Sequence, residues 1–110
     1  MTTININADM GESFGRFKVG NDEAILKVIN SASIACGFHG GDPTVMANAV
    51  RTAKENGVSI GAHPGFNDLW GFGRRQIQMN PKDLEYMISY QIGALNGIAA
   101  GFGMKVTHVK

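Results

Sequence analysis

The feature that most constrains the fold is a helix-start signal that occurs twice in the sequence. Asp42-Pro43 and Asn80-Pro81 each place a side chain that can accept backbone N–H bonds directly before a proline, and proline fits the first turn of a helix. Each signal follows a strand-like run and precedes an apolar stripe with helical spacing. The sequence is therefore divided into repeating units of one strand and one helix.

The predicted element order is β-α-β-α-β-α-β, which implies parallel strands joined by crossover helices. Closing a barrel usually takes about eight strands. We therefore expect residues 1–110 to be a single domain that forms the N-terminal βα units of a larger β/α barrel; the sequence ends inside a predicted strand, which favours a fragment. The alternative is a complete, open, four-stranded α/β domain. The predicted strands are 3–8, 33–36, 58–62 and 105–109, and the helices begin at Asn21 or Asp22, at Asp42-Pro43 and at Asn80-Pro81.

Composition excludes several classes of protein. Hydrophobic residues make up 44% and charged residues 17%, which predicts a packed core rather than disorder. The formal net charge of +1 provides no broad field for nucleic acid or an anionic membrane, and no apolar run approaches the ~20 residues of a membrane span. The single cysteine, Cys36, and an N-terminus without signal-peptide features predict a cytoplasmic protein.

Residues capable of chemistry follow the predicted strands at their C-terminal ends, where parallel α/β sheets bind ligands. The sequence has three histidines, and His39, His63 and His108 all lie at or just past such ends. Asp9 follows the first strand. We interpret Asp9, His39 and His63 as candidate catalytic acids and bases, and His108 as a candidate substrate-binding residue.

Other residues near these ends support two kinds of site. Asn7 and Glu12 are candidate substrate-binding residues, and Glu12 can pair with Asp9, because two close carboxylates can divide acid and base roles. Asp9, His39 and His63 also have the ligand types of a divalent metal site, although their spacing is not a zinc signature. The remaining polar or reactive side chains have structural interpretations: Asp42 as a helix cap, Cys36 as a buried strand residue and Gln91 as a satisfied core amide.

The loop at 66–75 combines aromatic residues, glycines and two adjacent arginines. Arginine can bind a carboxylate or phosphate through two parallel hydrogen bonds. Arg74 and Arg75 are therefore candidates for binding an anionic substrate. The alternative is a loop whose aromatics pack on the edge of the barrel while the arginines form surface ion pairs.

Five segments together resemble the LamB/YcsF family, in order and over essentially the whole chain. They are NADMGE at 7–12, ACGFHGGDP at 35–43, GAHPG at 61–65, GFGRR at 71–75 and YQIGAL at 90–95. The resemblance implies a seven-stranded β/α barrel similar to those of the glycoside hydrolase/deacetylase superfamily. Members of the family are more than twice this length, and Gly40 stands where many of them have alanine.

The family includes the A subunit of prokaryotic 5-oxoprolinase, a cyclic-amide hydrolase. The resemblance thus implies ATP-dependent opening of 5-oxo-L-proline to L-glutamate, with ATP as cofactor and subunits B and C as partners. One alternative is a metal-dependent deacetylase or amidohydrolase of the same fold. The other is a binding subunit that has no catalytic role of its own.

Overall fold

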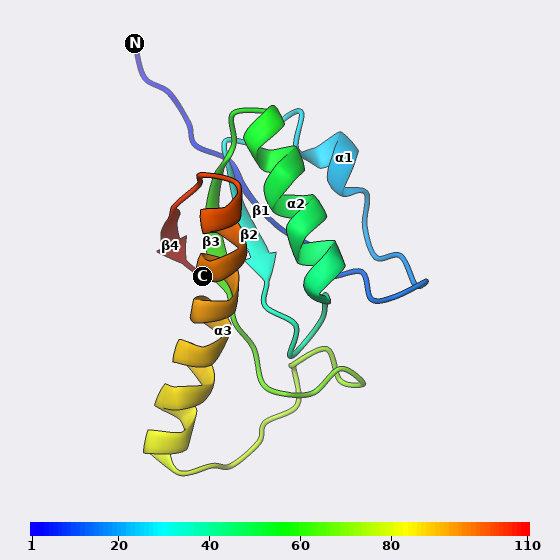
Figure 1. The fold of residues 1–110 in the computed structure, drawn as a ribbon, viewed down its shortest axis with the longest axis vertical. Helices are drawn as coiled ribbons and strands as arrows, with labels where there is room; N and C mark the ends of the chain where they lie inside the picture. The colour runs from blue at the N-terminus through cyan, green and yellow to red at the C-terminus, as the bar shows by residue number, and fades with distance from the viewer.

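The computed structural model describes residues 1–110 and contains four strands that alternate with three helices (Figure 1). This order is the one predicted from the sequence. None of the helices combines the length and the apolar content needed to cross a membrane. The elements are β1 (Asn7–Met10), α1 (Asp22–Ile25), β2 (Ser31–Ala35), α2 (Pro43–Glu55), β3 (Ser59–His63), α3 (Pro81–Gly101) and β4 (Val106–Val109).

The four strands form one parallel sheet in the order β1-β2-β3-β4. Every strand pairs with its neighbour in the sequence, so the C-terminal ends of all four strands lie at one end of the sheet. The register is shifted once, between Ile60 and Gly61 where β3 pairs with β4. The predicted parallel α/β fold is confirmed.

The two faces of the sheet have opposite character, because successive side chains of a strand point to opposite sides. On one face, Ile34 and Ile60 are fully buried under α2 and α3, which contact β2, β3 and β4. Figure 1 shows both helices lying on the same side of the strands. The other face carries mainly polar side chains, and the candidate site is built there. The apolar face and its helices share the core residues Met10, Ala32, Ile34, Ile60, Ala62, Met46, Ala49, Val50, Ala53, Leu95 and Ala99.

The helix caps form as expected from their local sequence. The carboxylate of Asp42 accepts the N–H of Val45 at 2.8 Å, and the side chain of Asn80 accepts the N–H of Lys82 at 2.8 Å. The second oxygen of Asp42 accepts the N–H of Gly15 at 2.7 Å, so the same carboxylate also holds the loop after β1. Backbone N–H bonds lower the pKa of Asp42 and keep it ionised.

The predicted start of the first strand is wrong, and the first helix is short. The first strand was expected at 3–8 but begins at Asn7, because its partner β2 starts only at Ser31 and earlier residues have no strand to pair with. The first helix is a single turn, Asp22–Ile25, followed by turns, because the chain must enter β2 a few residues later. Asn21 does cap it, through a bond from the N–H of Ala24.

Candidate active site

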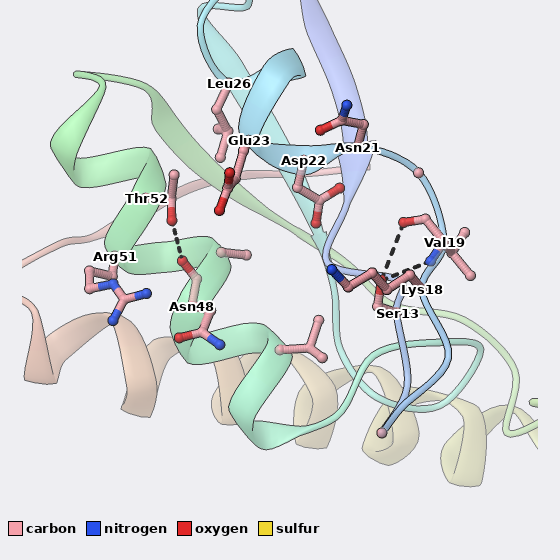
Figure 2. A pocket seen from close by; sticks show the side chains of 14 residues that line it. Ser13, Lys18, Val19, Asn21, Asp22, Glu23, Leu26, Asn48, Arg51 and Thr52 are labelled. Atoms are coloured by element: carbon pink, nitrogen blue, oxygen red, sulfur yellow. Dashed lines mark hydrogen bonds between the residues drawn. The ribbon is translucent and has the colours of Figure 1, made fainter.

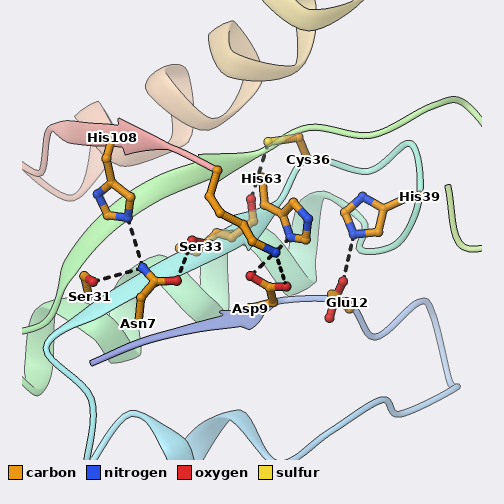
Figure 3. A network of polar contacts seen from close by, with 11 residues as sticks. Asn7, Asp9, Glu12, Ser31, Ser33, Cys36, His39, His63 and His108 are labelled. Carbon is orange, nitrogen blue, oxygen red and sulfur yellow. Dashed lines mark hydrogen bonds and ion pairs between the residues drawn. The ribbon is translucent and has the colours of Figure 1, made fainter. Parts of the chain in front are cut away.

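The strands bring four ionisable side chains to one end of the sheet. Asp9 lies in β1 and His63 is the last residue of β3, while Glu12 and His39 follow β1 and β2. Figure 3 shows the four side chains close together above the strand ends. The sequence predicted that Asp9, His39 and His63 lie near one another, and the geometry agrees. Their chemical roles remain predictions.

Glu12 and His39 form the most buried carboxylate–histidine contact of this group. A carboxylate oxygen of Glu12 lies 2.7 Å from Nε2 of His39, and the two side chains are 13% and 4% exposed. Glu12 was expected to pair with Asp9, but its carboxylate contacts His39 instead. Gly11, at φ +69°, turns the chain after β1 while Asp22 holds its N–H at 2.9 Å, and this turn directs Glu12 toward the loop of His39.

His39 sits in a narrow slot whose walls contain two glycines. A Cβ at Gly65 would lie 2.8 Å from Nδ1 of His39, and one at Gly73 would lie 2.6 Å from its Cβ. The edge of the Phe72 ring closes a third side, with ring centroids 5.2 Å apart. Phe72 is the one non-glycine residue with positive φ, at 56°, a conformation that bulky side chains rarely adopt. The loop after β3 is therefore shaped to hold the His39 ring.

His63 links the Glu12–His39 pair to a second pair. Its ring centroid is 4.6 Å from that of His39, and its Nδ1 is 3.7 Å from a carboxylate oxygen of Asp9. The other oxygen of Asp9 accepts a bond from Nζ of Lys110 at 2.7 Å. Burial lowers the pKa of His63, and nearby Asp9 only partly opposes this effect. His63 is therefore neutral near pH 7 and able to accept a proton.

Two buried nitrogen atoms of the site have no hydrogen-bond partner, Nδ1 of His39 and Nδ1 of His63. Buried polar atoms are normally paired, so such atoms mark a place where a ligand can bind. Glu12, His39 and His63 each offer a ligand atom, and these atoms all lie within 4.8 Å of one another. The metal-ligand candidates predicted from the sequence were Asp9, His39 and His63, with Asp9 in the place of Glu12. The compact set contains Glu12, whose carboxylate lies 2.7 Å from Nε2 of His39, whereas Asp9 lies 3.7 Å from Nδ1 of His63.

Further along the same face, His108 belongs to a different network from the other two histidines (Figure 3). Its Nε2 lies 3.2 Å from Nδ2 of Asn7, and its Nδ1 lies 2.9 Å from the hydroxyl of Thr107. Asn7 also bonds the hydroxyls of Ser31 and Ser33, each at 2.9 Å. The candidate substrate-binding residues Asn7 and His108 are therefore held together, one step along the sheet from Asp9 and His63.

One arginine of the loop forms an ion pair within the loop, as in the alternative interpretation of the sequence. Arg75 binds both carboxylate oxygens of buried Asp68, with its Nε 2.9 Å from one of them, and its guanidinium lies 5.3 Å from the centre of the Trp70 ring. These bonds hold the pKa of Asp68 at about 2. Arg74 is exposed and forms no ion pair. Neither arginine contacts Glu12, the histidines or Asp9.

The structural interpretations of three other residues are confirmed. Asp42 caps α2. Cys36 is 5% exposed, its thiol bonds the carbonyl of Ile34, and burial raises its pKa to about 11, which makes it a poor nucleophile. Gln91 is fully buried and all of its bonds are to backbone groups.

Lys110 is the site residue that sequence reasoning missed. It lies two positions after His108, and the two-residue period of a strand places both on the same face of the sheet. The same period relates Ser31 and Ser33, which bond Asn7. Alternation along strands was therefore the signal that could have found these residues.

A hollow lies elsewhere, between the loop after β1, α1 and α2 (Figure 2). It has a volume of about 580 Å³ and is lined mainly by polar side chains, including Lys18, Asp22 and Arg51. No unpaired buried polar atom faces it, because the two such atoms in the protein belong to His39 and His63. We therefore place the candidate active site at the strand ends.

Comparison with known proteins agrees with this picture. The model of the LamB/YcsF family matches residues 4–110. Relatives named as the A subunit of 5-oxoprolinase include those of Azoarcus sp. (59% identical over 110 residues), Gluconobacter oxydans (55% over 108) and Pyrococcus horikoshii (52% over 107). These matches cover 100%, 98% and 97% of this chain, and 43%, 42% and 42% of the relatives.

One solved structure superimposes closely on the chain, the crystal structure of a lactam utilization protein from Thermus thermophilus. The TM-score is 0.96 at 47% sequence identity, and the match covers 98% of this chain and 44% of that one. The chain thus has the TIM-barrel-like β/α arrangement of that family. It spans less than half the length of the curated relatives it matches.

Proposed function

This chain belongs to the LamB/YcsF family, and on that premise we propose that it is part of the A subunit of a 5-oxoprolinase. The reaction is the hydrolytic opening of 5-oxo-L-proline to L-glutamate. Water adds to the lactam carbonyl carbon, the C–N bond breaks, and the nitrogen takes up a proton. The names of the relatives and of the lactam utilization protein support this substrate class.

The observation that carries the proposal is the pair of carboxylate–histidine contacts at the strand ends. Ring opening needs a base for the attacking water and an acid for the leaving nitrogen. Neutral His63 suits the base, because burial lowers its pKa and Asp9 lies beside it. His39 lies 2.7 Å from the carboxylate of Glu12, which holds its ring in place, and we assign it the role of the acid.

The substrate carboxylate needs a cation near these groups. Arg75 is occupied by Asp68, so an incoming substrate would have to compete with a buried carboxylate for it. Lys110 forms an ion pair with Asp9, but both side chains are partly exposed, at 51% and 29%. An incoming carboxylate can therefore reach Lys110 more easily than it can displace buried Asp68 from Arg75. We assign the carboxylate contact to Lys110, with Asn7 and His108 as further polar contacts and Arg74 as the exposed alternative.

The remaining parts of the proposal concern the whole protein. An unactivated lactam is a poor electrophile, so we include ATP as the activating cofactor and subunits B and C as partners; the relatives are named as one lettered subunit, which supports an assembly. We propose that residues 1–110 form the N-terminal part of a larger β/α barrel. A buried free thiol and an ATP requirement favour the cytoplasm.

A second candidate function is favoured by the Glu12, His39 and His63 cluster. One carboxylate and two imidazoles are a donor set found in catalytic zinc sites, and one potential ligand atom from each of the three residues lies within 4.8 Å of the other two. Such an ion would lower the pKa of a bound water, as in metal-dependent amidohydrolases and deacetylases. Metal analysis of the purified full-length protein separates the two: one ion per chain, lost in Glu12→Ala, favours the metal-dependent reaction.

The test of the main proposal uses Glu12→Gln in the full-length protein, assayed with subunits B and C for glutamate formed from 5-oxoproline. The substitution keeps the size of the side chain but removes the carboxylate that contacts Nε2 of His39 at 2.7 Å, so we expect turnover to fall about 10²–10⁴-fold. Glu55→Gln, at an exposed position in α2, is the matched control and should retain activity. Wild-type turnover in Glu12→Gln would reject the proposal.

A further inference from the structure

Gln91 in α3 holds the loop that lies against the candidate catalytic histidines. The N–H of Gly65 donates to Oε1 of Gln91 at 2.9 Å, and Nε2 of Gln91 donates to the carbonyl of Gly65 at 2.9 Å. The same Nε2 also donates to the carbonyl of Met87, one turn earlier, at 3.1 Å. The side chain is fully buried, so water does not compete for these bonds.

The pattern of bonds fixes both the amide and the loop. Because Nε2 faces two carbonyls and Oε1 faces an N–H, only one orientation of the Gln91 amide satisfies all three bonds. The backbone N–H and the backbone carbonyl of Gly65 both bond the side chain of Gln91. Gly65 cannot move relative to α3 without breaking two buried hydrogen bonds.

Gly65 packs against the imidazole of His39 and lies close to His63 in the sequence. It follows His63 by two residues, and its Cα faces the His39 ring so closely that a Cβ would lie 2.8 Å from Nδ1. The two rings are 4.6 Å apart, centre to centre. The residue that Gln91 holds is therefore in close contact with one of these rings and two positions along the chain from the other.

We propose that Gln91 is a positioning residue, which sets the placement of His39 and His63 through Gly65. The kinetic consequence rests on the function proposed above, whereas the positioning itself does not. A purely structural role would make Gln91 equivalent to Leu95, which lies one turn further on, is also fully buried, and makes no bond to the loop. Apolar packing would then be enough at position 91.

The experiment compares Gln91→Met with Leu95→Ala in the full-length protein. Methionine fills a similar volume without the three hydrogen bonds, whereas alanine at 95 weakens the core without touching Gly65. In Gln91→Met we expect the side-chain NMR resonances of ¹⁵N-labelled His39 and His63 to shift, and kcat with subunits B and C to fall about 10- to 100-fold with little change in KM. In Leu95→Ala we expect a lower Tm, with the histidine resonances and kcat close to wild type.

Gln91→Glu serves as the second variant if Gln91→Met does not fold, because it keeps the shape of the side chain and can no longer donate to both carbonyls. Unchanged histidine resonances in a folded variant at position 91 would overturn the positioning role. Shifted resonances with normal kcat would support positioning and count against the proposed catalytic use of the histidines. Shifted resonances in Leu95→Ala equal to those at position 91 would reduce Gln91 to ordinary core packing.

Discussion

Replacing Gly65 by alanine tests whether the slot around His39 controls activity. The added Cβ would lie 2.8 Å from Nδ1, 2.9 Å from Cβ and 3.0 Å from Cγ of His39. Comfortable carbon contacts begin near 3.5 Å, so the ring or the loop must move by about 0.7 Å. His39 cannot retreat freely, because it is 4% exposed and bonded to Glu12, while Phe72 and Gly73 occupy other sides of the slot.

A shift of that size should affect catalysis more than folding. Misplacing a catalytic group by about 1 Å can cost about 10²-fold in rate, whereas overpacking a core typically costs about 1–3 kcal/mol of stability. We therefore expect Gly65→Ala in the full-length protein with subunits B and C to lower kcat for 5-oxoproline by about 10- to 100-fold, with a cooperative unfolding transition at a reduced Tm.

Gly97→Ala provides the matched control, because a Cβ there meets no atom within 4 Å and position 97 lies inside α3. Alanine in a helix interior is favoured over glycine by about 0.5–1 kcal/mol, so this variant should be slightly more stable and fully active. Wild-type kcat in folded Gly65→Ala would refute the argument that the slot fixes His39 for catalysis.

Three further outcomes follow from the site. His63→Ala should lower turnover about 10²–10⁴-fold without unfolding the protein. Because burial lowers the pKa of His63, the fall of wild-type kcat/KM on the acid side of the pH profile should lie below about pH 6.5. A fall that begins above that pH would contradict the role of His63 as base. Lys110→Met should raise KM for 5-oxoproline about 10-fold with a smaller effect on kcat, since a contact to a non-reacting carboxylate acts on ground and transition states alike. A fall in kcat with an unchanged KM would exclude a contact between Lys110 and the substrate carboxylate. Cys36 should resist iodoacetamide at pH 8 in the native protein and react after unfolding, because its thiol has a pKa of about 11 and the residue is 5% exposed. Rapid labelling of the folded protein would show that the thiol is accessible.

The parts of the fold that the sequence predicted are those determined by short-range physics. The caps at Asp42 and Asn80 are completed by bonds to residues two or three positions away, so the sequence of one turn determines them. The order of strands and helices follows from the period of the apolar residues, and the parallel sheet follows from that order. The start of β1 was wrong because the end of a strand depends on where its partner strand lies.

The site was predicted as a set of residues but not as a set of contacts. Strand ends place Asp9 and His63 on one edge, which a sequence pattern can indicate. The Glu12–His39 pair depends on the backbone conformation of Gly11, and the bond from Arg75 to Asp68 depends on how one loop folds back on itself. Such loop contacts have no periodic signal. Alternation along the strands did offer a signal, which would have pointed to Lys110 after β4 and to Ser31 and Ser33 in β2.

The spacing of paired strands along the chain also bears on the order in which the protein folds. Asn7 reaches its partner Ser31 across 24 residues, whereas Thr107 on β4 reaches Ile60 on β3 across 47 residues. Each doubling of the closed loop adds only about 0.6 kcal/mol of entropy cost, so the longer crossover is a modest handicap. The pairing of β3 with β4 nevertheless has the greatest sequence separation of the three strand pairings. β4 carries His108 and is followed directly by Lys110. β4 would thus join the sheet after β1, β2 and β3 have paired, and the cation beside Asp9 would arrive with it.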